Sequence, residues 1–238
     1  MPDRDLRFDP YLPQFGCLIL LLAMLGMCLL PLVALDLMEQ ALRNLHLSGP
    51  AVLATMVGIL VGGLINLPLY RIEHEEVQPV MRGYFLPGWG WVPLPRQPRE
   101  TLVAVNVGGC LIPAALAIYE ARLAWGDPQA RLGLVVACLV NVAVCYWLAR
   151  PVAGVGIALP ALVPPLVAVL LAWLFLGQAD SELRAPVAFV AGVCGPLIGA
   201  DLLHLREFSR VPAGIISIGG AGTFDGIVIS GLAAAFLA

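Results

Sequence analysis

The chain has 238 residues, of which 60% are hydrophobic and only 12% are charged. Soluble domains contain about 45–50% apolar and about 25% charged residues, so this composition excludes an ordinary soluble fold and predicts a protein whose main partner is the lipid bilayer. The net charge of −3 is too small for electrostatic capture of nucleic acid, and we expect no nucleic-acid partner.

A helix needs about 20 mostly apolar residues to cross a bilayer. The sequence therefore predicts an all-α membrane protein, a single polytopic domain over residues 1–238 with about seven transmembrane helices. A short stretch at 36–47 has apolar residues at helical spacing and is predicted to be an interfacial helix. In chain order, the predicted spans are Phe15–Leu35, Ala51–Tyr70, Leu102–Ala121, Leu132–Leu148, Ala161–Gly177, Pro186–Leu205 and Ile215–Leu237.

Two connecting regions look irregular. The loop 71–100 interleaves aromatic residues with Gly and Pro, and its aromatic side chains suit the headgroup region. We expect it to form a hairpin lying on the bilayer, at the inner side, where it could gate access to the bundle. The second region, Pro151–Pro165, holds so many helix breakers that it predicts a broken or re-entrant segment. The aromatic residues of the loop are Tyr84, Phe85, Trp89 and Trp91.

The distribution of arginine predicts the orientation of the chain, because cytoplasmic loops carry the excess of basic residues. Of the 13 basic residues, all arginine, nine fall on the side of the amino terminus and four on the other side. We therefore expect a multi-pass protein of the cell inner membrane with its amino terminus in the cytoplasm.

Nearly all of the 16 acidic residues lie in loops or at predicted helix ends, and Asp201 and Asp225 are the exceptions. An aspartate in a membrane helix costs about 2.5–3.5 kcal/mol on insertion scales, and such residues usually line a polar cavity or find a partner. These two occur in consecutive spans, and antiparallel neighbours can bring them together.

The segment 212–222 before Asp225 is rich in glycine, a poor helix former. If this segment is unwound, the helix begins near Thr223, with Thr223 as its N-cap. Asp225 then lies in the first turn, near the level of Asp201, where the positive helix end favours a carboxylate.

Three interpretations of the pair remain open. Both aspartates could be satisfied by Arg206, Arg210 or helix ends and only orient helices. They could lie on an ion or proton pathway. They could also share a catalytic site, because two carboxyl groups in one site do not both ionise easily. One then acts as a base on a water and the other as an acid on a leaving amine, as in aspartic proteases.

Other polar residues in the spans are candidates for the same cavity. His204 follows Asp201 by three residues, on the same helical face. These two with Asp225 could supply three metal ligands, but no HExxH motif is present, and we expect neither a metal nor another cofactor. The six cysteines have no CxxC spacing and are expected to be small apolar fillers. The predicted cavity-lining or substrate-binding residues are Gly220, Gly222, Thr223, His204, Asn66 and Asn106.

Four stretches of the sequence resemble an uncharacterised prokaryotic family of multi-pass membrane proteins over nearly the whole chain. They are Ile65-Asn-Leu-Pro-Leu-Tyr70, Val105-Asn-Val-Gly-Gly109, Gly199-Ala-Asp-Leu-Leu-His204 and Ser217-Ile-Gly-Gly-Ala-Gly-Thr-Phe-Asp-Gly226. That resemblance implies no activity.

More remotely, the two aspartates are similar to those of the GxGD-type intramembrane aspartyl proteases, namely presenilin, signal peptide peptidase and prepilin peptidase. In those proteins one aspartate comes from one span and the second from a GxGD motif that opens the next. The resemblance implies that Asp201 matches the first and Asp225 the second, although the motif here, Gly220-x-Gly222-x-x-Asp225, is two residues longer.

The sequence therefore favours an intramembrane diaspartyl hydrolase, a protease that cleaves membrane-embedded peptide segments with Asp201 and Asp225 sharing a catalytic water. One alternative is a proton- or cation-coupled transporter or channel that uses the same two aspartates. The other is a non-catalytic membrane subunit.

Overall fold

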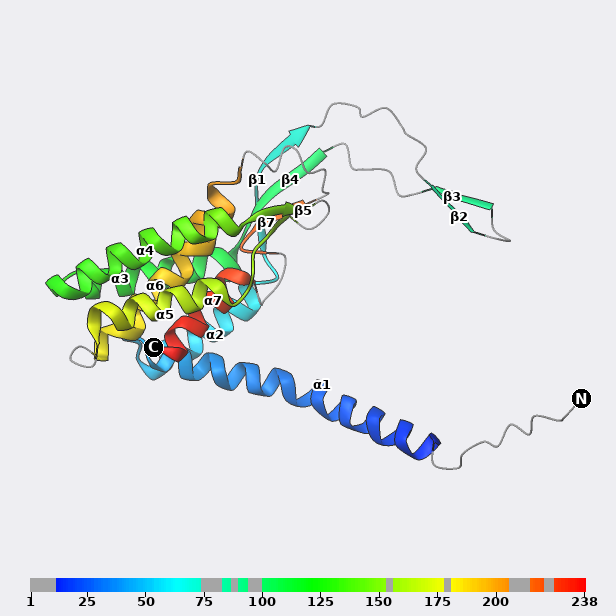
Figure 1. Ribbon diagram of the computed structural model, residues 1–238, viewed down its shortest axis with the longest axis horizontal. Coiled ribbons are helices and arrows are strands. Elements are labelled where there is room, and N and C mark those ends of the chain that lie inside the picture. Colours follow the sequence, from blue (N-terminus) through cyan, green and yellow to red (C-terminus); the bar gives the residue numbers. More distant parts are fainter. Residues whose placement is uncertain are drawn as a thin grey trace, which may run out of the picture.

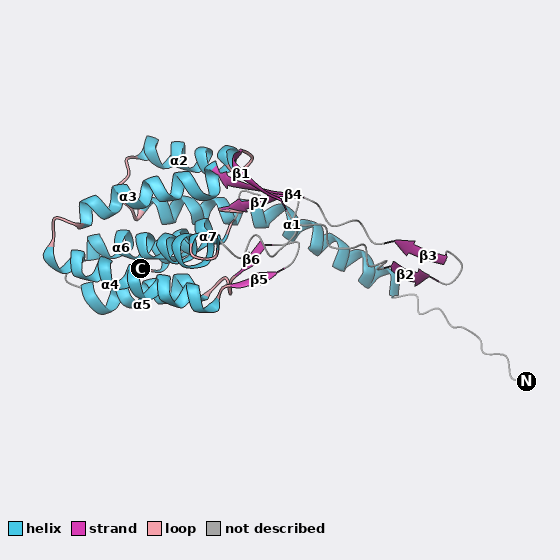
Figure 2. Cartoon of the chain, turned by 90° about the horizontal axis from the view of Figure 1, so that it is seen from above, coloured by secondary structure: helices cyan, strands magenta, loops and turns pink. Residues whose placement is uncertain are grey.

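The computed structural model describes eight stretches of the chain, which form seven α-helices, two π-helical segments and seven short strands. Most of the helices lie side by side in one bundle, and a small sheet covers one end of it (Figures 1 and 2). The described stretches are residues 12–73, 83–86, 90–93, 100–152, 156–177, 181–205, 215–220 and 225–238.

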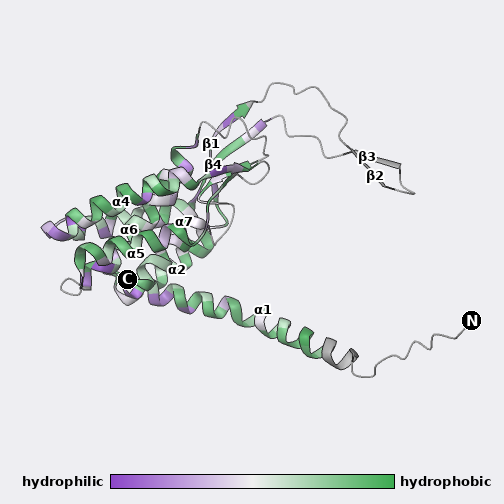
Figure 3. Cartoon of the chain, in the orientation of Figure 1, coloured by the Kyte–Doolittle hydropathy of each residue, from purple (hydrophilic) through white to green (hydrophobic). Residues whose placement is uncertain are grey.

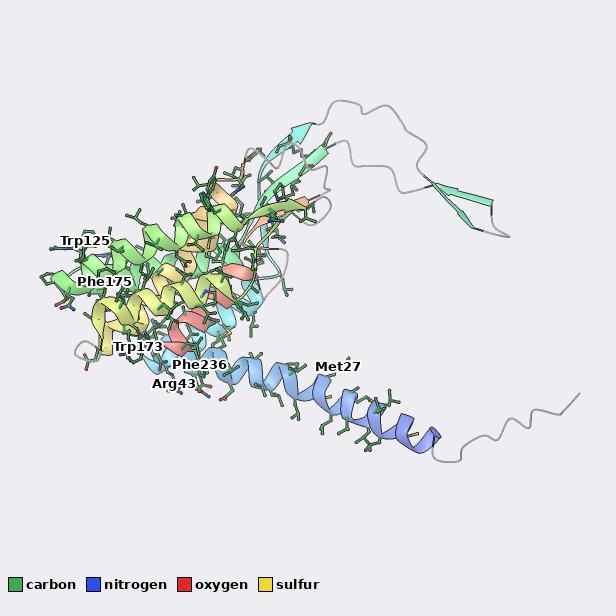
Figure 4. All side chains as sticks on the ribbon, in the orientation of Figure 1. Met27, Arg43, Trp125, Trp173, Phe175 and Phe236 are labelled. Carbon is green, nitrogen blue, oxygen red and sulfur yellow. The ribbon has the colours of Figure 1, made fainter. Side chains whose placement is uncertain are left out.

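Helix α1 (Leu12–Arg43) is a single helix of 32 residues that projects from the bundle (Figure 1). Its apolar part is exposed, as at Met27 with 76% of its surface accessible (Figures 3 and 4). Only its last turns are buried, and the amide of Asn44 just beyond them donates to the Ala235 carbonyl at 3.0 Å. The predicted separate interfacial helix at 36–47 is therefore wrong, because nothing in the sequence breaks the helix before Arg43.

The core of the bundle is built around α6. This helix packs against four others, and its run Val187–Ala191 is fully or nearly fully buried. Small residues on the facing helices, such as Ala137, Ala172 and Ala234, let the backbones approach closely. The helices of the bundle are α2 (Gly49–Gly62), α3 (Ile112–Ala124), α4 (Pro128–Leu148), α5 (Val163–Leu176), α6 (Ser181–Cys194) and α7 (Gly226–Leu237).

Among the described residues, four helices are long and apolar enough to cross a bilayer. They are Cys17–Arg43, Val107–Ala124, Pro128–Leu148 and Glu182–Leu202. The other three, α2, α5 and α7, have 12 to 14 residues. At 1.5 Å per residue they reach roughly 18–21 Å, less than the roughly 30 Å of hydrocarbon core. The helical prediction is thus right for the bundle, and four of the described helices have the length and composition of a membrane span where seven were expected.

Parts of the segments that were predicted to be helical form a sheet instead. Strands β1 (Asn66–Glu73), β4 (Glu100–Asn106) and β7 (Ile215–Ile218) are adjacent in the order β1-β4-β7. Strand β4 is antiparallel to β1 and parallel to β7, with Val103 opposite Ile216. The predicted helices at 51–70, 102–121 and 215–237 are therefore each part strand, and the strands satisfy their backbone groups on one another.

Two hairpins complete the described residues. Strands β2 (Gly83–Leu86) and β3 (Gly90–Pro93) pair with Phe85 opposite Trp91, which confirms the hairpin expected within 71–100, although Trp89 lies outside the described residues. Strands β5 (Arg150–Val152) and β6 (Gly156–Ala158) form the second hairpin before α5. Of the region 151–165 that was expected to be broken, residues 151–152 and 156–158 are extended, and residues 163–165 are the first turn of α5.

Candidate functional site

A two-glycine turn at the carboxyl end of β7 is the centre of the candidate site. Gly219 and Gly220 have φ angles of +81° and +73°, and the Gly220 N–H donates to the Ser217 carbonyl at 3.0 Å. Side chains other than hydrogen are strained at these φ angles. Glycine is therefore required here by backbone geometry, and the absence of side chains leaves the main chain of the turn open to close contacts.

Asp201 reaches this turn from a π-helical segment, η2 (Gly195–Leu202), that continues α6. Its Oδ2 accepts the Gly219 N–H at 3.2 Å, and its side chain is partly exposed. The wider turns of a π-helix are frequent at functional sites, since they re-aim side chains relative to an α-helix. Close packing holds η2, because a Cβ on Gly199 would collide with the Val142 carbonyl of α4.

Asp225 reaches the same turn from the start of α7. It is the N-cap of that helix, with Oδ2 accepting the Ile227 N–H at 3.2 Å. Its carboxyl group lies directly against the turn, because a Cβ on Gly220 would stand 2.6 Å from Asp225 Oδ1. The N-cap is thus Asp225 and not Thr223, so the predicted start of the helix near Thr223 is wrong by a few residues.

The two carboxyl groups are consequently held on consecutive residues of one turn, Asp201 on Gly219 and Asp225 against Gly220. They interact electrostatically with each other. The approach segment is extended or turned over its described residues, 215–220, as expected from its glycines. Gly222, Thr223, Arg206 and Arg210 lie outside the described residues.

Cys110 packs against the turn. It belongs to a second π-helical segment, η1 (Val107–Leu111), which precedes α3. A Cβ on Gly219 would come within 2.6 Å of Cys110 Cβ, so the turn packs directly on Cys110. This placement could not be predicted, because Cys110 is an ordinary small residue in an apolar run.

Asn66 and Asn106 connect the strands that carry the turn. Asn106 is fully buried, donates to the Gly63 carbonyl at 2.7 Å and accepts the Gly109 N–H at 2.6 Å. The Asn66 Oδ1 accepts from Asn106 at 3.1 Å and from the Ser217 hydroxyl at 2.6 Å. These bonds link the start of β1, the end of β4 and β7, so both asparagines stabilise the strands next to the turn.

His204 lies at the interface between η2 and α4. Its Nδ1 lies 3.1 Å from the Gly199 carbonyl and 3.0 Å from the Ala200 carbonyl, both in η2. Its ring packs against Tyr146 of α4 at an angle of 35°, with centroids 4.8 Å apart. The described contacts of His204 thus join η2 to α4, and its place in a substrate cavity stays a prediction.

A second buried carboxyl group, that of Glu120, lies toward the carboxyl end of α3. Glu120 is fully buried, accepts the His46 N–H at 3.1 Å and contacts His46 Nδ1 at 3.1 Å. The Tyr119 hydroxyl donates to the His46 carbonyl at 3.2 Å. In the sequence Glu120 lies at the end of a predicted helix. Its position next to an apolar run indicated that it could be buried, but its partner His46 is far away in the sequence and could not be predicted.

The four long apolar helices and the paired carboxyl groups at one end of the bundle define the class of the molecule, a helical membrane protein with a polar site. The chain belongs to the family described as "Protein of unknown function (DUF1614)", whose family model matches residues 60–237. No curated protein and no solved structure is detectably similar to it. The expected membership of an uncharacterised family is confirmed, and the comparisons give no support to the resemblance to GxGD-type proteases.

Proposed function

We propose that the protein is an intramembrane diaspartyl hydrolase, a protease that cleaves membrane-embedded peptide segments. One observation carries the proposal: Asp201 accepts the Gly219 N–H, and the Asp225 carboxyl lies against Gly220, the next residue of the same turn. Two carboxyl groups this close differ in their readiness to ionise, which supplies a base and an acid in one site.

The proposed reaction uses each carboxyl group for one proton. The ionised carboxylate removes a proton from a water between the two groups, and the water oxygen attacks the peptide carbonyl. The protonated carboxyl group donates a hydrogen bond to the carbonyl oxygen as charge develops there. A proton then passes to the leaving amine, and the C–N bond breaks. Partial exposure of both aspartates is compatible with the entry of water.

The substrate backbone would approach over Gly219 and Gly220, where no side chain stands in the way. The loop 71–100 would gate this approach from the inner side. In this proposal all three short helices cross as well, α5 by itself and α2 and α7 together with β1 and β7, which with the four long helices gives seven crossings of the cell inner membrane with the amino terminus in the cytoplasm. The excess of arginine on that side supports the orientation.

The test is a cleavage assay with the purified full chain in proteoliposomes. The probes are apolar helical peptides of about 20 residues that carry a fluorophore and a quencher. We expect cleavage by the unmodified chain and none by Asp201→Asn or Asp225→Asn. Asp36→Asn is the matched control, since Asp36 is an exposed carboxylate on α1. Activity that survives in either site variant overturns the proposal.

A transporter or channel is the second candidate, and one observation favours it. The aspartates lie beside two π-helical segments, η1 and η2, and a turn, and broken helices of this kind are where many transporters bind ions. This candidate predicts proton or sodium flux into proteoliposomes that depends on both aspartates, with no peptide cleavage.

A further inference from the structure

One face of α3 forms an open groove at the end of the bundle remote from the aspartates. The groove has a volume of about 410 Å³ and is lined by Ile118, Ala121, Arg122 and Trp125. These residues are spaced by three or four positions, so they lie in one row along the helix. Ile118 is 64% exposed and Trp125 is 53% exposed. Because α3 belongs to a helix long and apolar enough to cross a bilayer, lipid is the expected neighbour of this face.

Aromatic residues indicate that one end of the groove lies at the level of the lipid headgroups. Trp125 directly follows the last residue of α3, and Trp173 lies in the last turn of α5. Both lie at the end of the bundle away from the sheet (Figure 4). Tryptophan is enriched at this boundary in membrane proteins. Ile118 precedes Arg122 by four residues, which is about 6 Å along the helix, so the groove runs from the headgroups toward the acyl chains.

Two positive charges stand at the headgroup end of the groove. Arg122 lines it, and the Arg131 guanidinium of α4 lies over the Trp125 ring, 5.9 Å from its centroid. Asp127 precedes α4, and its Oδ1 accepts the Ala130 N–H at 2.7 Å as the N-cap. Within the part of the chain that the structure describes, neither guanidinium has a carboxylate at ion-pair distance. Two guanidiniums against one capping carboxylate leave this end of the groove positive.

Two other arginines at the same end of the bundle are bound by the chain itself. Arg43 donates to Glu39 at 2.6 Å. Arg184 donates to the Gly177 carbonyl at 2.7 Å and lies over the Trp173 ring, 3.6 Å from its centroid. The two guanidiniums beside the groove have no such polar partner among the described residues, so their N–H groups are available to a ligand.

We propose that the groove binds one anionic phospholipid, with its phosphate at Arg122 and Arg131 and an acyl chain along Ile118 and Ala121. Guanidinium groups bind phosphate oxygens through paired, charge-assisted hydrogen bonds. A headgroup with a net negative charge is preferred over a zwitterionic one, because the ammonium group of the latter is repelled by the two arginines. The groove supplies the apolar surface that a free phosphate does not use. The proposal is independent of the reaction assigned to the aspartates.

The experiment uses the full chain in nanodiscs of phosphatidylcholine. A small, equal fraction of the lipid is replaced by phosphatidylglycerol or by phosphatidylcholine with brominated acyl chains, since bromine quenches tryptophan fluorescence on contact. The chain has five tryptophans, so the contribution of Trp125 is obtained by comparison with Trp125→Phe. We expect brominated phosphatidylglycerol to quench Trp125 more strongly than brominated phosphatidylcholine. Equal quenching of Trp125 by the two lipids overturns the proposal.

Arg122→Gln and Arg131→Gln should each lower the preference for phosphatidylglycerol about fivefold, which corresponds to about 1 kcal/mol for one basic residue near anionic lipid. Arg43→Gln is the matched control, because Arg43 is an exposed arginine at the same end that already pairs with Glu39. It should leave the preference unchanged. The proposal is overturned if the groove variants keep the full preference, or if a large excess of inorganic phosphate abolishes it, which would indicate a site for free phosphate.

Discussion

The two ends of the bundle each hold a buried carboxyl site, and the sites differ in what the carboxyl groups face. At one end, Glu120 is fully enclosed and faces the His46 ring and N–H. At the other end, Asp201 and Asp225 are partly exposed, accept backbone N–H groups and lie against consecutive glycines of one turn.

This difference indicates a structural role for Glu120 and a chemical role for the two aspartates. A carboxyl group enclosed by an imidazole and an N–H group has its oxygens satisfied, and its removal costs stability. Two carboxyl groups on one turn oppose each other, an arrangement that costs free energy unless one of them binds a proton. Proteins keep such arrangements where the proton is used. The comparison therefore predicts that substitutions at the two ends affect different measurements.

The largest effect is expected from the aspartates. Asp201→Asn and Asp225→Asn should each lower peptide cleavage by at least about a thousandfold, because each removes one proton-transfer group. The double variant should be no worse than either single one, since the two act as a unit. Folding should be retained, because the Asn oxygen still accepts the Gly219 N–H at position 201, and Asn is as good an N-cap as Asp at position 225.

The second prediction concerns the turn. Gly220→Ala places a methyl group against the Asp225 carboxyl at a φ of +73°, and a displacement of about 1 Å at a catalytic group lowers activity about a hundredfold. Gly177→Ala is the matched control, because Gly177 also has a positive φ, +52°, but has open space around it. Both variants carry backbone strain of about 1–3 kcal/mol, and only the first should lose activity per folded molecule. Equal activities would contradict the placement of Asp225.

The third prediction sharpens the comparison from the opposite end. Glu120→Gln removes a buried partner of His46 and should lower the free energy of unfolding by about 1–3 kcal/mol. Activity per folded molecule should stay unchanged, because Glu120 is remote from the turn. Heat denaturation in detergent gives the first quantity, and Glu39→Gln in the exposed pair with Arg43 gives a control that should change by less than about 1 kcal/mol. If Glu120→Gln lost activity but kept its stability, the structural role assigned to Glu120 would be wrong.

The smallest expected effect is at the support of the turn. Ser217→Ala removes the hydroxyl that donates to Asn66 at 2.6 Å and should cost about 0.5–1.5 kcal/mol. Ser48→Ala serves as the control, because Ser48 precedes α2 without a side-chain capping bond. If both substitutions have the same effect on the denaturation temperature, the Asn66 bond contributes nothing to the sheet.

The helical part of the fold was readable from the sequence. The predicted span 132–148 corresponds to α4 (Pro128–Leu148), because a long uncharged run has one stable solution in a bilayer. Asn141 of α4 joins that helix to its neighbours, because its side-chain amide donates to the Pro164 carbonyl of α5 and the Ala191 carbonyl of α6. A buried amide in a span has few other ways to satisfy its polar atoms.

The sheet and the details of the site were not readable. Strands β1, β4 and β7 are apolar runs that look like helix ends, and only their mutual pairing makes them strands. The glycines before Asp225 did predict an interruption, but not that Gly219 would receive Asp201. A π-helical segment has no sequence signature, so the turn of His204 toward Tyr146 could not be foreseen.

The most direct test of the shared site is a structure of the full chain with a bound peptide whose scissile amide is replaced by a secondary alcohol. Such an alcohol resembles the tetrahedral transition state and binds more tightly than substrate. The account predicts that its hydroxyl lies within about 2.6–3.2 Å of a carboxyl oxygen of both Asp201 and Asp225. A peptide bound elsewhere, or a hydroxyl that contacts neither or only one of the aspartates, would contradict the account.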